Sequence, residues 1–384
     1  MRPRREPILS PELIRDDDRP EVDLGPGPTL HARSSIREDP SGWAARLGVG
    51  LDAVQDYMAC DVVDLHVESF IWTRVFRYDL QRWHAHTALG GRLFGQADLP
   101  RMRAVGLSGV VMSVATNPFR SAAGRRRACV HNLARLRAAL DQPGTAVVAD
   151  AAGYDRARAA GDLACFIALQ GANAVRPEHL ADPAFDVVSR ITLMHLTRSR
   201  YGTTSAPGGR RGGLRAEGRN VIAAMRARAI LLDLAHASPR TFWDALEAHG
   251  RDAPVIVSHT GAGAVCRSWR NLDDEQIRAI AHTGGVVGII LQRSFLAHPG
   301  WRASADDVVA HMEHVIRIGG EAAAAIGSDY DGFIVPPRDL ATVTALPRLV
   351  QRMHDRGWSA ARVAAVLGAN ALQVMRAVRP GADR

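Results

Sequence analysis

Eight short apolar runs, separated by segments with helical periodicity, constrain the fold of this chain most strongly. The runs are almost continuously hydrophobic, which is typical of strands buried on both faces of a parallel sheet. Eight such strands alternating with helices over about 270 residues predict a (β/α)8 barrel of the TIM type. A doubly wound open sheet is the alternative, but no glycine-rich dinucleotide fingerprint follows the first run. The predicted strands span residues 61–68, 106–115, 163–172, 191–197, 229–236, 254–260, 284–291 and 323–332.

The rest of the chain indicates one catalytic domain with an N-terminal extension. Residues 1–45 of the 384 are rich in Pro, Asp, Glu and Arg and show no sustained apolar period, which is typical of a flexible segment. Residues 46–384 are expected to form a single barrel domain. The N-terminus lacks the apolar region of a secretory signal, and no stretch reaches the roughly 18 apolar residues of a membrane span. We therefore expect a cytoplasmic protein without a membrane partner.

Charge and cysteine content exclude several classes of function. All 48 basic residues are Arg, so the chain has no Walker lysine, Schiff-base lysine or carbamylated metal-bridging lysine. The net charge of +8 comes from Arg residues scattered among 40 acidic ones, and no recognition motif accompanies it, so nucleic acid is not an expected partner. The four cysteines lie far apart without a C-x-x-C pair, which predicts neither a disulfide framework nor a thiolate zinc site.

Polar side chains that are costly to bury end most of the predicted strands. In a parallel barrel the C-terminal ends of all strands open on one face, where the reacting groups lie. Residues far apart in the sequence are therefore expected to meet at one mouth, where their nitrogens and oxygens suit zinc or a similar divalent ion. These residues are His66, Glu68, Gln170, His195, His236, His259, Asp329 and Asp331.

Other polar residues have a plainer interpretation. His84 and His86 have the H-x-H spacing of a metal motif but follow no apolar run, so we expect them on a loop or a helix surface. His311 and His314 lie three residues apart on a predicted helix and are expected on its solvated face. Asp64, inside the first strand, is either a carboxylate that orients a ligand histidine or a structural hydrogen-bond acceptor.

The order and spacing of these motifs resemble the membrane (renal) dipeptidase family of zinc metallopeptidases. The resemblance runs from about residue 58 to 378 and is carried by GQADLPRMRAVGLSG, LLDLAHAS, PVIVSHTGAGAVCRSWRNLDDEQIRAIAHTGGVVGI, GSDYDG and GWSAARVAAVLGANALQVMRAV. It implies a (β/α)8 barrel of the metal-dependent hydrolase type with a two-metal site. His66, Glu68 and Asp329 would hold one ion, and His236 and His259 would hold the second. Two divalent ions about 3.5–4 Å apart can together stabilise a tetrahedral intermediate.

The resemblance also implies how the substrate is bound. His195 would contact the substrate, polarise its carbonyl group and stabilise the oxyanion, while Asp329 would also serve as the proton shuttle. Arg270 would bind the C-terminal carboxylate, because its forked guanidinium can donate two parallel hydrogen bonds. The expected partner is therefore a small peptide-like substrate with a free carboxylate.

Two positions depart from the family pattern. Glu68 stands where the family usually has Asp, which is a modest change. Gln170 occupies the place of a glutamate that bridges both ions. A neutral amide oxygen can coordinate one ion, but it does not supply the negative charge that offsets repulsion between two dications. We therefore expect the second ion to bind weakly or not at all.

Three functions stay open: a hydrolase that works with one or two metal ions, a biosynthetic tailoring enzyme with altered chemistry, and a catalytically impaired homologue that acts as a binding protein. Because the chain retains most of the site, the two enzymatic functions are favoured over the third. Segment 198–215, rich in Gly, Ser and Arg, is either a basic lid that recruits an acidic substrate or a solvated loop. A homodimer is a further open alternative.

Overall fold

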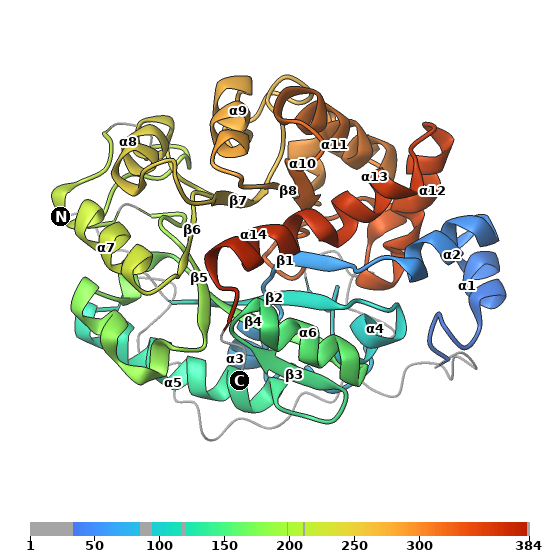
Figure 1. Cartoon of the computed structure of the whole chain (residues 1–384), viewed down its shortest axis with the longest axis horizontal. Coiled ribbons are helices and arrows are strands. Elements are labelled where there is room, and N and C mark those ends of the chain that lie inside the picture. Colours follow the sequence, from blue (N-terminus) through green and yellow to red (C-terminus); the bar gives the residue numbers. More distant parts are fainter. Residues whose placement is uncertain (1–33, 85–93, 117–119, 198, 210–211, 382–384) are drawn as a thin grey trace, which may run out of the picture.

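Eight parallel strands close into a barrel, in which β1 pairs with β2 and β9, and β2 pairs with β4. Helices surround the strands (Figure 1), so the fold is the predicted (β/α)8 barrel. The computed structural model describes residues 34–84, 94–116, 120–197, 199–209 and 212–381. The barrel strands are β1 (Val63–Val67), β2 (Gly109–Ala115), β4 (Leu163–Gln170), β5 (Val188–Thr192), β6 (Leu231–Asp233), β7 (Val255–Thr260), β8 (Val287–Ile289) and β9 (Ala324–Ile326).

Every barrel strand overlaps one of the eight predicted runs. β5 begins at Val188, before the predicted start at Ile191, because the charged Arg190 lies inside the strand and conceals its first half. A further strand, β3 (Thr145–Val148), pairs with the first half of β4 outside the barrel and is not predicted by the apolar runs. It has only four residues, two of them partly exposed, so it lacks the long apolar run of a strand buried on both faces.

Side-chain caps define where several helices begin. α9 starts with a capping box, in which Asp273 Oδ1 accepts from Gln276 N at 2.8 Å and Gln276 Oε1 accepts from Asp273 N at 3.1 Å. α8 starts with Ser238 as cap and Pro239 at its first position. The helices are α1 (Pro40–Leu47), α2 (Leu51–Ala59), α3 (Phe70–Phe76), α4 (Leu99–Ala104), α5 (Ala122–Leu140), α6 (Ala151–Ala160), α7 (Ala216–Ala227), α8 (Pro239–His249), α9 (Asp274–His282), α10 (Arg293–Leu296), α11 (Ala305–Gly319), α12 (Pro347–Asp355), α13 (Ala360–Ala364) and α14 (Asn370–Val378).

The N-terminal segment is partly helical. α1 begins at Pro40, inside the stretch that the sequence predicts to be a flexible extension, and its Trp43 is buried. Asp39 caps this helix by accepting a hydrogen bond from Gly42 N at 2.8 Å. The predicted boundary at residue 45 thus falls within a helix, whereas residues 1–33 lie outside the described residues.

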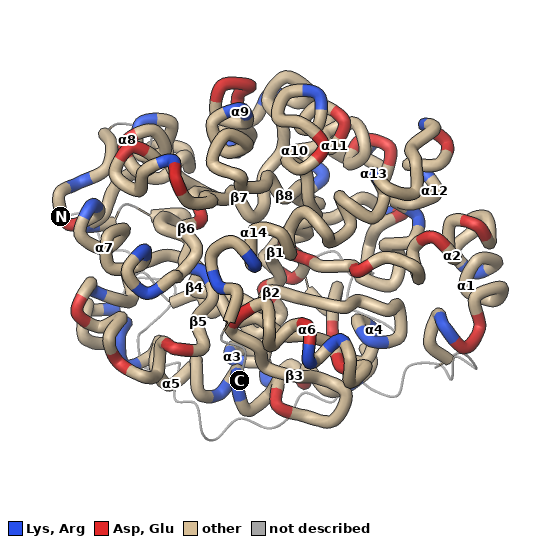
Figure 2. The backbone as a smooth tube through the Cα atoms, viewed as in Figure 1, with Lys and Arg blue, Asp and Glu red and all other residues tan. Residues whose placement is uncertain are grey.

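Charged residues are distributed around the outside of the barrel. Figure 2 shows Arg interspersed with Asp and Glu along the helices and loops. Several form exposed ion pairs, such as Arg362 with Glu321 at 2.6 Å and Arg158 with Asp61 at 2.7 Å, each of which contributes little to stability. In the described part of the chain, no helix has both the length and the apolar character needed to cross a membrane.

The interior of the barrel changes from apolar to polar along its axis. Near the N-terminal ends of the strands, Val63 and Phe166 form one buried apolar cluster with Leu372 of α14. Further along the strands the interior holds a buried ion pair between Arg190 and Asp233. The apolar end is therefore closed by α14, and the polar side chains gather towards the opposite end.

Close backbone packing around Gly327, which follows β9, allows a test of the barrel geometry. A Cβ atom at this position would lie 1.7 Å from the carbonyl oxygen of Ser258. Because backbone cannot yield as a side chain does, Gly327→Ala is expected to lower the free energy of unfolding by roughly 1–3 kcal/mol. The matched control is Gly124→Ala on α5, where the nearest atom is the Ser121 hydroxyl at 3.1 Å. Urea denaturation measures both variants, and equal stabilities would contradict the packing described.

Candidate metal centre

The six predicted ligands meet at the C-terminal end of the barrel, because parallel strands deliver their ends to one face. His66 on β1 and His259 on β7 stack with their ring centroids 3.9 Å apart. This contact joins two groups of buried side chains. We call them the acidic half, which is His66, Glu68 and Asp329, and the histidine half, which is Gln170, His236 and His259.

In the acidic half, two carboxyl groups face one imidazole. His66 Nε2 lies 3.3 Å from Glu68 Oε1 and 3.5 Å from Asp329 Oδ1. Backbone pairing sets this geometry, since Asp329 N donates to His66 O at 2.9 Å and Glu68 N donates to Tyr330 O at 2.9 Å. The hydrogen bonds between the two chain segments therefore place both acids beside the same ring.

In the histidine half, three donor groups form a small triangle. His236 Nε2 and His259 Nε2 are 2.9 Å apart, and the amide nitrogen of Gln170 lies 3.2 and 3.4 Å from them. Donors on a tetrahedral zinc ion are separated by about 3.4 Å when the bonds are about 2.0–2.1 Å long. Rotating the Gln170 amide by half a turn exchanges its nitrogen and oxygen, so its oxygen can face the same point.

Buried atoms without partners indicate that these residues fit a cation. His66 Nε2, Glu68 Oε1 and Gln170 Oε1 are inaccessible to solvent and have no hydrogen-bond partner among the described residues. Unsatisfied buried groups are costly, and a bound cation would satisfy the two oxygens. Donor atoms of His66, His259 and Asp329 also lie within 4.8 Å of one another. This set of nitrogen and oxygen donors suits zinc or another divalent ion of its class.

Burial keeps the histidines of the site neutral. Desolvation is the main cause that lowers the pKa of His66, His236 and His259 well below the usual value, and positively charged neighbours act in the same direction. A neutral imidazole keeps a lone pair for a cation. Burial also raises the pKa of Glu68 and of Asp329 well above the ordinary value, and for Glu68 the nearby charge of Asp329 adds to the effect.

Two of the candidate ligands have a left-handed backbone conformation. The φ angle is 64° at His236 and 61° at Asp329. Such a conformation costs a non-glycine residue about 1–3 kcal/mol, and this kind of strain is concentrated at functional sites. The carbonyl oxygen of His236 is held by Thr204 Oγ1 and Ser205 N, which donate to it at 3.0 and 2.8 Å.

His195 and Arg270, the predicted substrate-binding residues, adjoin the histidine half. The ring of His195 meets the ring of His236 edge-on, with centroids 4.9 Å apart. Burial, and then the charge of Arg270, lowers the pKa of His195 to about 4, so its ring is neutral at pH 7. Arg270 is buried and donates to the carbonyl oxygen of His259. Arg270 forms no ion pair with a carboxylate of the described residues, although the charges of Asp329 and Asp233 act on it.

A polar layer beneath the ligands is the part of the site that the sequence does not predict. Arg190 on β5 pairs with Asp233 on β6, and both are fully buried. Asp233 also accepts from Thr192 Oγ1 and Ser258 Oγ at 2.6 Å each, and Ser258 Oγ lies 2.8 Å from His259 Nδ1. Burial opposes ionisation of Asp233, but the charge of Arg190 and these hydrogen bonds hold its pKa below the ordinary value. A carboxylate inside an apolar run is the feature that could have drawn attention to Asp233.

Among the plainer candidates, the three described histidines are buried rather than exposed. His84 lies on a loop but is buried, because it stacks on Tyr78 and its Nε2 lies 2.7 Å from Asp79 O; His86 lies outside the described residues. The prediction of a solvated face on α11 is wrong. His311 is buried between Ala262 N at 2.8 Å and Leu296 O at 3.0 Å, and the buried His314 pairs with Asp274 at 2.6 Å. Backbone groups and an acid satisfy these rings, so burial is not costly.

Two aspartates near the site have structural roles. Asp64 Oδ1 accepts from His66 N at 3.1 Å and from Ser328 N at 2.9 Å, so the second of its two predicted roles applies. Burial raises the pKa of Asp64 to about 6. Asp331, which ends the predicted eighth strand, does not face the ligands, since its carboxylate accepts from Gln96 N at 2.8 Å.

Segment 198–215 packs against the barrel over much of its described length. Tyr201, Thr203 and Thr204 are buried, and Thr204 pairs with Ala237 in an isolated bridge. A wholly solvated loop is therefore a wrong description of this part. Arg210 and Arg211, two of the arginines in this segment, lie outside the described residues, so the lid interpretation stays a prediction.

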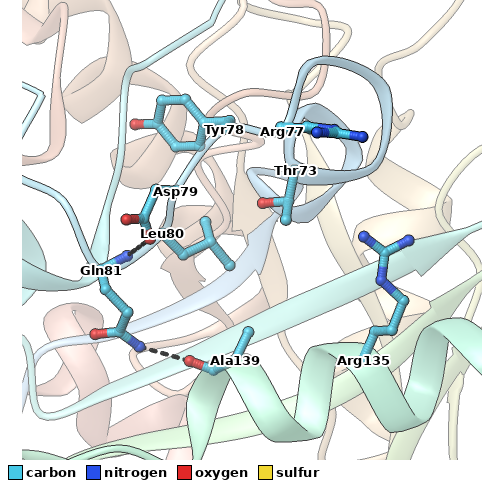
Figure 3. A pocket seen from close by; sticks show the side chains of 8 residues that line it. All are labelled: Thr73, Arg77, Tyr78, Asp79, Leu80, Gln81, Arg135 and Ala139. Carbon is cyan, nitrogen blue, oxygen red and sulfur yellow. Dashed lines mark hydrogen bonds between the residues drawn. The ribbon is translucent and has the colours of Figure 1, made fainter. Parts of the chain in front are cut away.

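A surface pocket of about 550 Å³ lies between α3 and α5, away from these ligands. Figure 3 shows the side chains that line it, among which Gln81 Nε2 donates to Ala139 O at 2.6 Å. None of the candidate ligands lines this pocket, so it is not part of the metal centre.

The low pKa of His195 makes stability depend on pH in a way that can be measured. The folded chain keeps the His195 ring neutral down to a pH of about 4, whereas in the unfolded chain the ring takes up a proton below a pH of about 6.5. The contribution of the neutral ring to the free energy of unfolding is therefore lost as the pH falls. In chelator-treated protein, we expect the unaltered chain to have a higher free energy of unfolding than His195→Gln at pH 7. This difference should be about 1–2 kcal/mol smaller at pH 5. Urea unfolding measures this, with the exposed His131→Gln as control. A difference in free energy of unfolding that is the same at pH 5 or larger there would contradict the low pKa of His195.

Comparisons with known proteins place the fold and the sequence of this chain in a known family. Dipeptidase aclJ of Aspergillus oryzae is 28% identical over 335 residues, which cover 82% of this chain and 77% of that protein. An uncharacterized protein in the pqqA 5′ region of Klebsiella pneumoniae is 36% identical over 169 residues, 43% of this chain and 61% of the relative's length. The crystal structure of dipeptidase AC, a family M19 metallopeptidase, superposes with a TM-score of 0.69 and 25% identity, covering 84% of this chain and 99% of the other. The family model for membrane dipeptidases matches residues 55–384, so this chain belongs to the membrane dipeptidase family, peptidase family M19.

Proposed function

We propose that this protein is a metal-dependent hydrolase that cleaves the amide bond of a dipeptide or a small peptide-like substrate with a free carboxylate. The observation that carries the proposal is the meeting of six nitrogen and oxygen donors from five strands next to His195 and Arg270. Membership of the membrane dipeptidase family supports the same activity.

Zinc is the proposed ion. When bound, it supplies a Lewis acid that polarises the scissile carbonyl group and makes water more acidic. Glu68 and Asp329 are the only anions in the ligand set, because Gln170 is neutral. Two dications would place four positive charges against two negative ones, so we propose that one ion binds tightly and a second weakly or not at all. The proposed ligands are His66, Glu68, Gln170, His236, His259 and Asp329.

The chain's own side chains transfer the proton and orient the substrate in this proposal. Asp329, whose pKa is raised by burial, takes a proton from water and later gives it to the leaving amine. His195 donates a hydrogen bond from its neutral ring to the carbonyl oxygen as negative charge develops there. Arg270 binds the free carboxylate, which fixes the C-terminal residue of the substrate beside the ligands.

The cytoplasm is the proposed location. Cys60, Cys129, Cys165 and Cys266 are all free and buried, as is usual for cysteines in a reducing compartment. Burial raises the pKa of Cys129 to about 12, which keeps its thiol protonated and unreactive.

Restoring an anion at residue 170 tests the proposed metal count. We expect the unaltered protein, dialysed against metal-free buffer, to retain about one zinc ion per chain, and Gln170→Glu to retain about two, because the added carboxylate offsets repulsion between the ions. Elemental analysis measures the zinc content, and dipeptide hydrolysis should rise in the variant. Two tightly held zinc ions in the unaltered protein would contradict the proposed count.

The same pair of proteins separates the candidate functions. A protein that already hydrolyses dipeptides and gains nothing from Gln170→Glu is a one-metal hydrolase. No hydrolysis in either form would overturn the proposed activity. It would favour a tailoring enzyme with altered chemistry, for which the loss of the anion at Gln170 is the specific observation.

Arg270 provides a test of substrate binding. The variant Arg270→Met lacks the guanidinium that would donate hydrogen bonds to the substrate carboxylate. KM for a dipeptide with a free carboxylate should therefore rise about 10- to 100-fold. The control substrate is the same dipeptide with an amidated C-terminus, for which KM should change little. Steady-state kinetics compares the two. An equal loss with both substrates would show that Arg270 supports the backbone of His259 instead of binding the carboxylate.

A further inference from the structure

Arg190 is a fixed cation in direct contact with a candidate ligand. Its side chain is 1% exposed and crosses the barrel interior from β5 to β1. One terminal nitrogen pairs with Asp233, and the other lies 2.9 Å from His66 Nδ1 and 3.1 Å from Ser113 Oγ. Neither family membership nor the proposed function assigns a role to this residue.

The hydrogen-bond chemistry of Arg190 determines where His66 carries its proton. A guanidinium only donates hydrogen bonds, so His66 Nδ1 must accept. A neutral imidazole has one acceptor and one donor nitrogen, and the proton of His66 therefore lies on Nε2. This is the nitrogen that faces Glu68 at 3.3 Å and Asp329 at 3.5 Å. A protonated nitrogen has no lone pair for a cation.

His259 is arranged in the opposite way. Its Nδ1 lies 2.8 Å from Ser258 Oγ, and this hydroxyl donates its single proton to Asp233 at 2.6 Å. The hydroxyl oxygen is therefore left to accept from His259 Nδ1–H, which frees the lone pair of Nε2. In metal sites, histidine ligands nearly always donate their second nitrogen to an oxygen in this manner. In the histidine half, His259 Nε2 therefore has a lone pair available for a cation, whereas His66 Nε2 in the acidic half does not.

We propose that Arg190 is a positioning residue that keeps the proton of His66 on Nε2 and makes the acidic half the weaker of two cation positions. The inference rests on the proposed metal site and identifies which half of it binds weakly. Two effects of Arg190 act together: its donor to Nδ1 opposes coordination by His66 Nε2, and its positive charge repels a dication nearby. The histidine half keeps Asp329 within reach as an anion, since the donor atoms of Asp329 and His259 lie within 4.8 Å.

Zinc affinities of full-length variants test this role. Competition with a chromophoric chelator should give one tight and one weak dissociation constant for the unaltered protein. In Arg190→Met the weak constant should tighten by about 10- to 100-fold, the usual size of an effect on metal affinity from groups behind the ligands. Arg190→Lys keeps a buried cation that only donates, so its weak constant should stay within about threefold of the original.

Arg101 supplies the matched control for removing a buried arginine. It is 3% exposed and pairs with Asp98 at 2.6 Å. One of its terminal nitrogens donates to the carbonyl oxygen of Gly95, which is not a candidate ligand. Arg101→Met should therefore leave both zinc constants unchanged. If Arg190→Met fails to fold because Asp233 is left unpaired, the double variant Arg190→Met/Asp233→Asn restores charge balance and should show the same tightening.

The tautomers can be read directly in the unaltered full-length chain. After chelation, two-bond nitrogen–proton NMR spectra of histidine-labelled protein should show His66 protonated on Nε2 and His259 on Nδ1, assigned with His66→Gln and His259→Gln. A proton on His66 Nδ1, or unchanged zinc constants in the Arg190→Met and double variants, would overturn the role of Arg190 alone. No zinc binding in any form would overturn the metal site as well. None of these measurements uses peptide hydrolysis. Failure of the role of Arg190 can therefore be distinguished from failure of the proposed hydrolase activity.

Discussion

The carboxylate of Asp233 is the group on which the geometry of the site depends. It pairs with Arg190 from β5 and accepts hydrogen bonds from the Ser258 side chain on β7, so it links the neighbours of its own strand. Through Ser258 it orients His259, and through Arg190 it reaches His66. In a low-dielectric interior a fully satisfied network of this kind is rigid, and breaking it leaves a buried charge. The two stacked histidines are thus held from below by one carboxylate.

The charges around the mouth set the electrostatics of the candidate site. The ligands carry two carboxyl groups, Glu68 and Asp329, while Arg190 and Arg270 bring two permanent positive charges close to them. Gln170 lies beside His236 and His259 and adds no charge. If the proposed function holds, these positive charges would disfavour a second metal ion and favour an anionic substrate.

The sequence predicts the barrel and the meeting of the candidate ligands at one end of it because the same physical fact underlies both. Strands buried on both faces are continuous apolar runs, so a polar residue at the end of a run, such as Gln170 or His259, is conspicuous. The polar layer beneath the candidate ligands is not conspicuous in the sequence. Arg190 lies before the predicted start of its strand, and its partner Asp233 is 43 residues away. That pair exists only once β5 and β6 lie side by side. His311 shows the same limit, because its polarity is visible in the sequence but the backbone groups that satisfy it are not.

Strain and unsatisfied polar atoms favour a binding site over a barrel retained only for its shape. His236 and Asp329 each hold a left-handed conformation that costs about 1–3 kcal/mol, and glycine would adopt it without strain. His66 and Glu68 bury polar atoms without partners among the described residues. Each of these features lowers the stability of the fold, yet all of them lie on the residues that face one another at the mouth. A bound cation would satisfy the Glu68 oxygen and use the positions that the strained backbone fixes, so binding would recover part of the lost stability.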